Sequence, residues 1–491
     1  MGELVREMLI SYDAMESRVA ILENGSLAEV YFERPKRSVV GNVYLGMVRD
    51  VLPGMQSAFV DIGLEKNAFL HVDDIPAQLI PTVGTKREIQ TLLRVDQTIM
   101  VQVTKDPIGT KGCRVTAEIT FPGRFLVLTP FAATIGMSKK LAKEECARLQ
   151  AIIAPHLSEE VGAIIRTAAQ DISERDLLSD LEFLLRLWKR VSRQADEGFA
   201  PEVIYTEIDL ALRLVRDVFS EDFKRLVVDD KSVHAKVVSF LKRASSKPLN
   251  KVQLHKDARR TLFEAFGIDA EIQKMLTRSI DLPSGGYICI DHTEALTVVD
   301  VNTGKFIGRH DLEETVFQTN YEAASEIARQ LRLRDIGGIV VIDFIDMAEA
   351  YHRNEVVRRF SAAMERDRAR YKVGEISKFG LLEITRRPFS EGANSSLTEQ
   401  CSCCDGRGRI PSTLTRRIAV ERTIKSAIRQ GKATAYLVAV NPDTYRILMA
   451  PGANLVPRMR ASTGRYVTVV PDESCGPVEV KILLEGARRD A

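Results

Sequence analysis

Two runs of β-branched residues, each carrying an aspartate near its end, constrain this chain more than any other feature. The runs are Ala295–Asn302 and Ile339–Asp346, and their aspartates are Asp300 and Asp343. Such runs are typical of central strands that are buried on both faces. A buried aspartate is costly unless it is paired or bound to a cation. We therefore expect the two strands to build one shared site.

The segment between the two runs predicts a helix. Asp311 and Glu314 have the spacing of a capping box, and Gly337-Gly338 is a stop signal. An apolar stripe lies between them at Ala324, Ile327 and Leu331. A strand–helix–strand unit of this kind places both strands in one sheet, with both aspartates at the same edge.

Carboxylate oxygens favour a hard cation, and Mg²⁺ keeps several waters on one or two protein carboxylates. Such an ion can polarise a phosphoryl oxygen and activate water, which is the chemistry of phosphodiester hydrolysis. Asn302 lies two residues beyond Asp300 and shares its strand face, whereas Asp346 is expected to point away from Asp343. The alternative is that both aspartates only bond to backbone groups at strand ends.

Residues 39–120 contain short strands separated by glycines, which predicts a small closed barrel. The order of the segments resembles the S1 RNA-binding domain, an OB-fold barrel. Phe59 and Phe69 stand where that domain presents rings that stack on bases, and Lys111 could reach a phosphate. The alternative is that both rings belong to the barrel core.

Two local signals flank the barrel. Asn24-Gly25 between apolar runs predicts a β-hairpin near the start of the chain. After the barrel, Arg166-Thr167 follows the apolar pair Ile164-Ile165 at a predicted strand end. A guanidinium and a hydroxyl can together hold a phosphate, although such a dipeptide is usually only a solvated strand end.

Three of the seven cysteines crowd together at Cys401, Cys403 and Cys404, followed by a Gly-x-Gly. Cys401 and Cys404 have the spacing of a zinc knuckle. Zinc needs four ligands and the chain has no second Cys-x-x-Cys, so two chains would each give a pair and form a dimer. A free thiol cluster or a redox pair are the alternatives.

Composition excludes several classes of protein. A length of 491 residues predicts two or more domains, and a formal net charge of +2 does not by itself indicate a polyanion binder. No apolar run approaches the roughly 18 residues that span a bilayer, and the N-terminus lacks the apolar core of a signal peptide. We expect a cytoplasmic protein.

Taken together, the motifs resemble the bacterial endoribonucleases of the RNase E/G family over essentially the whole chain. The carrying segments are 41–75, VVDVNTG around Asp300, RQLRLRDIGGIVVIDFIDM at 329–347, RDRAR at 366–370, ISKFGLLEITR at 376–386, and the cysteine knuckle. The chain is shorter than members with a long disordered tail, so we expect it to be most like the short members.

The resemblance implies a multidomain α+β fold. It comprises a split RNase H-like domain around an inserted S1 barrel and 5′-sensor region, then a DNase I-like catalytic α/β domain, a zinc link and a small dimerisation domain. The implied boundaries are 1–35 and 215–280 for the RNase H-like parts, 36–119 for S1, 120–214 for the sensor, 281–397 for the catalytic domain, 398–411 for the zinc link, and 412–491 for the small domain.

The resemblance also implies roles for single residues. Asp300 and Asp343 match the magnesium ligands, with Asn302 in support. The RNA-gripping positions of the barrel are matched by Phe59, Phe69 and Lys111. A pocket that senses a 5′-monophosphate is matched by Gly123, Val127, Arg166, Thr167 and Arg370. Cys401 and Cys404 match the zinc pair. Ser402-Cys403 replaces the usual residues between them, so that Cys403 is a third candidate ligand.

The leading hypothesis is therefore a Mg²⁺-dependent endoribonuclease that cuts single-stranded RNA and leaves 5′-phosphate and 3′-hydroxyl ends. The resemblance implies rRNA and tRNA maturation and mRNA decay. It also implies a zinc-linked homodimer, with a homotetramer as the alternative. One alternative is an RNA-binding protein without hydrolytic activity, which would have no need of two carboxylates that repel phosphate. A DNA nuclease is the other, because sequence does not show which residue reads the 2′-hydroxyl.

Overall fold

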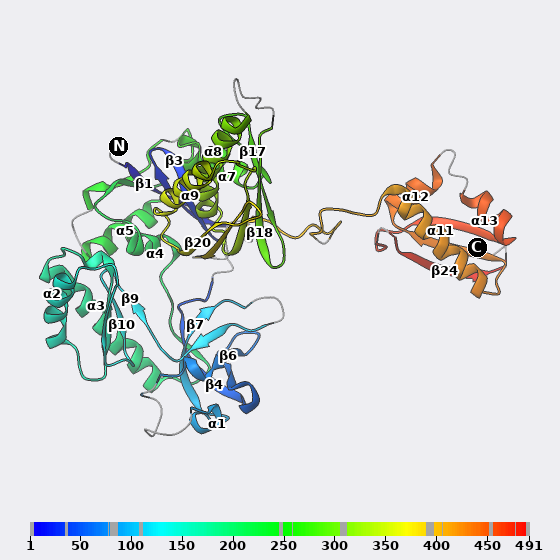
Figure 1. The fold of residues 1–491 in the computed structure, drawn as a ribbon. Coiled ribbons are helices and arrows are strands. Elements are labelled where there is room, and N and C mark those ends of the chain that lie inside the picture. The colour runs from blue at the N-terminus through cyan, green and yellow to red at the C-terminus, as the bar shows by residue number, and fades with distance from the viewer. Residues whose placement is uncertain are drawn as a thin grey trace. The chain divides into compact units, whose positions relative to one another are not determined.

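The computed structural model describes residues 4–34, 38–76, 78, 87–107, 111–244, 249–257, 259–304, 312–388, 397–404, 406–450, 455–476 and 478–487. The chain divides into two compact units, Met1–Leu397 and Thr398–Ala491 (Figure 1). The fold is mixed α/β with a closed five-stranded barrel, as the sequence predicted at that level. Among the described helices, none has the length and apolar character required to traverse a bilayer.

The first sheet combines the N-terminal strands with strands from far along the chain. Its order is β15 (Val252–Leu254), β14 (Phe223–Val228), β1 (Arg6–Tyr12), β2 (Ser17–Glu23), β3 (Ser26–Glu33). One face packs on α4 (Leu210–Asp217) and α5 (Lys231–Ala244), and the other on α6 (Leu262–Ala265) and α7 (Ile268–Met275). The predicted hairpin is confirmed, because Asn24 and Gly25 have φ of 51° and 80° between β2 and β3.

The barrel lies between β3 and β14 in the sequence. Its strands are β4 (Val43–Leu52), β5 (Ser57–Asp61), β6 (Ala68–His71), β8 (Arg114–Thr116) and β7 (Thr98–Lys105), and pairing of β7 with β4 closes it. The short helix α1 (Ile89–Leu92) adds Ile89 to its core. An outer strand, β13 (Glu202–Tyr205), pairs with β4 and joins the barrel to the next part of the chain.

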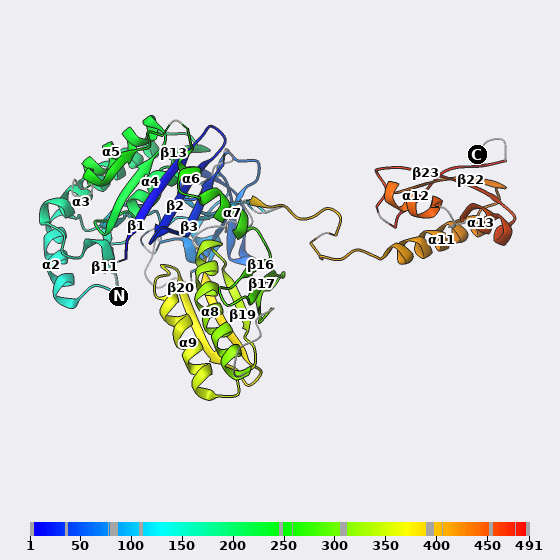
Figure 2. The ribbon, with the colours of Figure 1, turned by 90° about the horizontal axis from the view of Figure 1, so that it is seen from above.

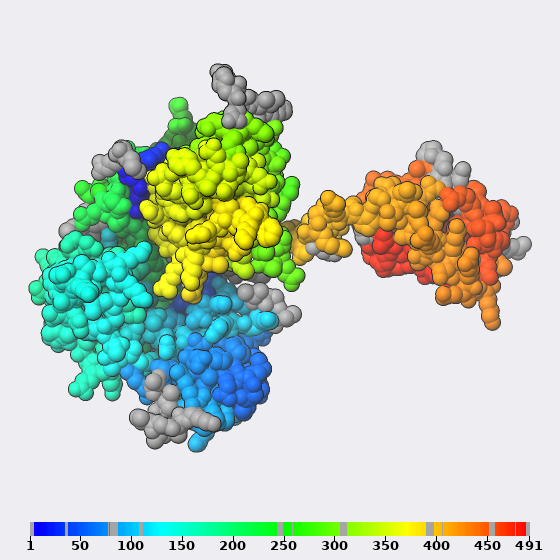
Figure 3. Space-filling model, in the orientation of Figure 1, coloured from blue at the N-terminus to red at the C-terminus, as the bar shows by residue number. Residues whose placement is uncertain are grey.

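That next part is a four-stranded sheet with two helices. Its order is β11 (Ile135–Met137), β12 (Gly162–Ile165), β10 (Leu126–Thr129), β9 (Phe121–Pro122), with α2 (Lys143–Ile153) and α3 (Glu174–Glu197) packed on it. Val43 and Leu45 of the barrel strand β4 belong to the same core as α3. Figure 3 shows this region in turquoise beside the barrel in blue and light blue.

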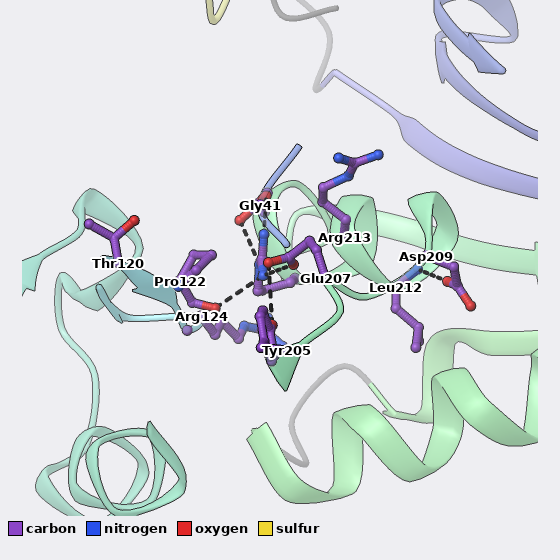
Figure 4. A network of polar contacts seen from close by, with 12 residues as sticks. Gly41, Thr120, Pro122, Arg124, Tyr205, Glu207, Asp209, Leu212 and Arg213 are labelled. Atoms are coloured by element: carbon purple, nitrogen blue, oxygen red, sulfur yellow. Dashed lines mark hydrogen bonds and ion pairs between the residues drawn. The ribbon is translucent and has the colours of Figure 1, made fainter. Parts of the chain in front are cut away.

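Hydrogen bonds of polar side chains connect the base of the barrel to this region (Figure 4). Gln102 donates to the carbonyls of Gly41 and Thr120 over 2.9 and 3.0 Å, and the backbone N–H of Glu207 donates to Asn42 over 2.9 Å. Gln102 and Asn42 are both buried, so these bonds are shielded from water. The barrel is therefore fixed at its base by side-chain-to-backbone hydrogen bonds.

A mixed six-stranded sheet, which we call the aspartate sheet, follows. Its order is β16 (Ser279–Asp281), β17 (Tyr287–His292), β18 (Leu296–Asn302), β19 (Gly338–Asp343), β21 (Leu381–Arg387), β20 (Arg370–Ile376). The helices α8 (Leu312–Leu333) and α9 (Ala350–Met364) pack side by side on one face (Figure 2). The expected strand–helix–strand unit is present as β18–α8–β19, with the two strands parallel.

The ends of α8 differ from the expectation. The proposed capping residue Asp311 lies outside the described residues. The helix ends at Leu333, before Gly337-Gly338, and Asp335 takes a left-handed φ of 49° shortly after it. Gly337 has a packing role instead, because a Cβ there would lie 2.3 Å from the Pro388 ring.

The second unit is a small α/β domain with the strand order β23 (Tyr466–Pro471), β22 (Ala435–Val440), β24 (Val480–Gly486). Its helices are α11 (Thr413–Gln430), α12 (Pro442–Met449) and α13 (Leu455–Thr463). The sequence pattern did not predict strand β24.

Candidate functional site

Asp300 and Asp343 lie directly opposite each other on the neighbouring parallel strands β18 and β19. Both are exposed, on the face of the aspartate sheet opposite α8 and α9. Their chain neighbours Val299 and Ile342 are fully buried in the core beneath. Alternation along the two strands therefore puts apolar residues inward and brings both carboxylates together on the open face.

Negative charge accumulates at this pair of carboxylates. Asn302 Nδ2 donates to Asp300 Oδ2 over 2.6 Å. Within the described chain, neither aspartate forms an ion pair or accepts a hydrogen bond from a backbone N–H. Burial and then the charges of Asp300 and Asp346 raise the pKa of Asp343. The alternative that these carboxylates only bond to backbone groups thus has no support in the described contacts.

The strand alternation from which the orientation of Asp346 was predicted does not apply at this position. Strand β19 ends at Asp343, so the alternation of side chains does not extend to position 346. Asp346 is instead near enough to contribute to the raised pKa of Asp343, and its Oδ1 lies 3.3 Å from where a Cβ of Gly380 would be. Asp346 therefore adds to the local negative charge. No strand pattern in the sequence indicates this contribution.

This donor set fits a hard divalent cation. The open carboxylate pair is negatively charged, consists of oxygen ligands and is accessible to water, as Mg²⁺ sites are. In the described part of the chain, no group of three or more His, Cys, Asp or Glu side chains is arranged to hold a metal ion. Two protein carboxylates completed by water or substrate oxygens are consistent with both observations.

Phe59 and Phe69 form a pair on the outside of the barrel. They are opposite each other on β5 and β6, with ring centroids 6.1 Å apart and an interplanar angle of 69°. Both rings are partly exposed and absent from the barrel core, whereas their neighbours Ala58 and Leu70 are fully buried in it. The alternative that the two phenylalanines are core residues is wrong.

Lys111 lies just before the barrel strand that pairs with the strand of Phe69. It is exposed and precedes β8, the strand that runs parallel to β6 and pairs Arg114 with Phe69. Gly112 must be glycine here, because a Cβ would lie 2.0 Å from the carbonyl oxygen of Asn67. Two rings and a lysine on one barrel surface are a suitable platform for bases and phosphates.

Four of the five residues predicted for the end-phosphate pocket come together in the four-stranded sheet. Arg166 and Thr167 follow β12 directly, and Arg166 Nη1 donates to the carbonyl of Gly123 over 2.7 Å. Val127 pairs with Ile164 on the neighbouring strand β10. The Thr167 hydroxyl is 2.7 Å from the hydroxyl of Ser138 (Oγ), and no sequence motif indicates Ser138 as a site residue.

Gly123 is required by a buried carboxylate. Asp180 of α3 accepts hydrogen bonds from three consecutive backbone N–H groups, those of residues 124–126, over 2.9–3.2 Å. A Cβ on Gly123 would lie 2.6 Å from Asp180 Oδ2. Burial raises the pKa of Asp180 despite these donors and the nearby charge of Arg166. Asp180 thus fixes the backbone of residues 124–126, which lie 54 to 56 positions before it in the chain, and this loop faces Arg166.

Arg370, the fifth predicted residue, begins the edge strand β20 of the aspartate sheet. It is exposed and pairs in register with Arg387. Among the described residues, no hydrogen bond or ion pair connects Arg370 with Arg166 or Thr167. The structure thus brings four of the five positions together and leaves Arg370 on another sheet.

The cysteine segment forms a tight turn in the second unit. The backbone N–H of Cys404 donates to the carbonyl of Cys401 over 3.3 Å, and Gly406 and Gly408 take left-handed φ of 75° and 69°. Backbone N–H groups of Cys403 and Cys404 lower the pKa of the Cys401 thiol. Within the ranges described for this unit, the cysteines do not by themselves make a metal-holding group of three.

Comparison with known proteins connects this architecture to a family. A profile of the ribonuclease E/G family matches residues 120–388. Ribonuclease G of Escherichia coli (strain K12) is 38% identical over 474 residues, covering 95% of this chain and 97% of that protein. Ribonuclease G of Haemophilus influenzae is 38% identical over 476 residues, with the same two shares. Ribonuclease E of Nostoc sp. (strain PCC 7120) is 37% identical over 420 residues, covering 82% of this chain and 61% of that protein.

The chain belongs to the ribonuclease E/G family. Within that family it is most like ribonuclease G, because the similarity runs through 97% of the ribonuclease G sequences. The resemblance predicted from the motifs is confirmed.

Proposed function

We propose that this protein is an endoribonuclease that hydrolyses single-stranded RNA with Mg²⁺ held by Asp300 and Asp343. The observation that carries the proposal is the in-register carboxylate pair on the open sheet face, in a chain of the ribonuclease E/G family. A protein that only binds RNA gains nothing from two unpaired carboxylates that repel phosphate. That alternative, and a DNA nuclease, are outcomes of the test below.

Asp300, Asp343 and Asn302 of the aspartate sheet each have a distinct role in this chemistry. Bound Mg²⁺ supplies polarisation of the scissile phosphate and a water of lowered pKa. Asp300 and Asp343 are the ligands, and the Asn302 amide holds Asp300 Oδ2 in a fixed orientation. Cleavage breaks the bond between phosphorus and the 3′ oxygen, so the products carry a 5′-phosphate and a 3′-hydroxyl. rRNA and tRNA maturation and mRNA decay are the processes we assign to it.

The proposed hydrolysis of single-stranded RNA suggests a role for each domain. We assign the barrel as an S1 domain in which Phe59, Phe69 and Lys111 hold unstacked bases and backbone. The first sheet is assigned as an RNase H-like scaffold, and the aspartate sheet with α8 and α9 as a DNase I-like catalytic domain. Incubation of the purified protein with labelled single-stranded RNA or DNA, in Mg²⁺ or in EDTA, tests the function. Cleavage of RNA that is independent of Mg²⁺, or none at all, would contradict it.

We also propose that the pocket of Gly123, Val127, Arg166 and Thr167 senses a 5′-monophosphate, with Arg370 of strand β20 as a further contributor. Arg166→Ala should slow cleavage of 5′-monophosphorylated RNA by about tenfold to a hundredfold, because a charge-assisted hydrogen bond of roughly 1.5–3 kcal/mol is lost. The same RNA with a 5′-hydroxyl should be cut almost as before. Measurement of kcat/KM on both RNAs checks this. Equal slowing of both would show a general defect in place of end sensing.

Zinc is proposed to join two chains through Cys401 and Cys404 of each. The double variant Cys401→Ser, Cys404→Ser should lose stoichiometric zinc and dissociate toward monomers, because thiolate ligands from both chains are required for a four-coordinate site. Metal analysis and analytical ultracentrifugation measure both effects. Cys403→Ser is the matched control and should keep zinc. One zinc per chain in the unmodified protein, in place of one per two chains, would reject the shared site.

A further inference from the structure

Arg166 is held on one side only. Its Nη1 atom donates to the carboxylate of Asp217 over 2.7 Å and to the carbonyl of Gly123 over 2.7 Å. Its Nε and Nη2 atoms make no hydrogen bond to any residue that the structure describes, and the side chain is 28% exposed. Nη1 of the guanidinium therefore has its hydrogen-bond partners, whereas the Nε–Nη2 edge has none among the described residues. This edge of an arginine binds a phosphate through two parallel hydrogen bonds.

Asp217 is itself fixed from behind. It is the last residue of α4, and both of its carboxylate oxygens accept hydrogen bonds from the neighbouring Arg216 over 3.2 Å. Arg216 is buried, and its Nη1 donates to Glu207 over 2.8 Å and to the carbonyl of Pro122 over 3.0 Å. Figure 4 shows Glu207 and Pro122 in this network, next to Tyr205 and Gly41.

We propose that Asp217 is a positioning residue for end-phosphate recognition, which holds Nη1 of Arg166 so that the Nε–Nη2 edge faces a terminal phosphate monoester. The inference rests on the proposed end sensing. An arginine side chain loses rotamer entropy when it binds a ligand, and a fixed carboxylate that holds Nη1 removes much of that freedom before the phosphate arrives.

The charges of the network agree with this role. A lone carboxylate beside a phosphate site would repel the ligand. Here the two arginines, Arg166 and Arg216, balance the two carboxylates, Asp217 and Glu207. Burial of Asp217 opposes ionisation, but the charges and hydrogen bonds of Arg216 and Arg166 prevail and lower its pKa. Asp217 therefore remains an ionised acceptor, and its own charge is neutralised on the side away from the pocket.

The test compares kcat/KM for two RNAs that differ only in a 5′-monophosphate or a 5′-hydroxyl. Asp217→Asn should lower the ratio of the two values by about tenfold, the equivalent of one charge-assisted hydrogen bond. In an Arg166→Ala background it should cause no further fall, because the group it positions is gone. Asp222→Asn is the matched control: Asp222 lies nearby in the chain and pairs with Arg6 over 2.7 Å, not with Arg166. It should keep the ratio.

Asp217→Glu guards against a folding defect, because it keeps the charge for Arg216 but displaces the Arg166 fork by one methylene, so the ratio should fall there too. A ratio unchanged in both Asp217 variants overturns the inference, and so does a ratio that rises in Asp217→Asn, which would make Asp217 a competitor of the phosphate. If the unmodified protein itself shows no preference, the proposed end sensing fails and the inference fails with it. A normal preference that Arg166→Ala abolishes and Asp217→Asn leaves intact overturns the inference alone.

Discussion

Asp300→Asn and Asp343→Asn should each lower the rate of RNA cleavage by roughly a hundredfold to a thousandfold at saturating Mg²⁺. The amide is nearly isosteric with the carboxylate, so the strand pairing between β18 and β19 should persist while the anionic ligand is lost. RNA binding should stay the same or tighten, because one negative charge that repels phosphate has been removed. Single-turnover cleavage and a binding titration in EDTA separate the two effects.

Asp291→Asn is the matched control for this experiment. Asp291 lies on β17 of the same sheet, two residues from Cys289, which pairs in register with Asp300. Its carboxylate is already occupied by an exposed ion pair with Arg278 over 2.5 Å. The control should cut RNA at the normal rate. Near-normal turnover by either Asp300→Asn or Asp343→Asn would show that the carboxylate pair is not the metal site.

The aspartate pair could be predicted from sequence because every step in it is local. The β-branched runs and the helix between them are recognisable in the sequence. The expected burial on both faces of the strands is wrong, because one face of the sheet is open and exposes Asp300 and Asp343. Parallel pairing then puts Asp300 beside Asp343 without any further information. The hairpin at Asn24-Gly25 is predictable for the same reason, because asparagine and glycine adopt the positive φ values that its turn requires.

Residues that act through distant partners could not be predicted in this way. Asp180 bonds to residues 124–126, Asp217 to Arg166 51 positions away, and Ser138 to Thr167 29 positions away. Each is an ordinary polar residue on a helix or at a strand end, and only the packed fold gives it a partner. Strand β24 was missed for another reason: Ile482, Leu483 and Leu484 are all exposed, so its apolar residues show no alternation between a buried and a solvent face.

A buried ion cluster lies at the end of β19 opposite to Asp343, where Arg386 pairs in register with Gly338, and its disruption should have the largest effect on stability. Arg386 of β21 donates from Nε to Asp367 over 2.6 Å, and from Nη1 to Asp335 and to the carbonyl of Ile336, each over 2.8 Å. The three side chains are 2–7% exposed. Burial lowers the pKa of Arg386, but Asp367 and Asp335 outweigh it and raise the pKa. The cluster joins β21 to the segment before β19 and to the segment between α9 and β20.

Arg386→Met should destabilise the aspartate sheet by about 3–5 kcal/mol, because it removes the guanidinium that bonds both buried carboxylates. Hydrogen exchange of the β19 and β21 amides measures the loss locally, and cleavage activity should fall with it as Asp343 loses its fixed position. Arg386→Lys keeps the charge but cannot bond both aspartates in the same planar geometry, so an intermediate loss is expected. Arg278→Met, which breaks an exposed pair on the same sheet, should leave exchange in β19 unchanged. Equal protection in Arg386→Met and Arg278→Met would mean that the buried cluster does not hold the strand that carries Asp343.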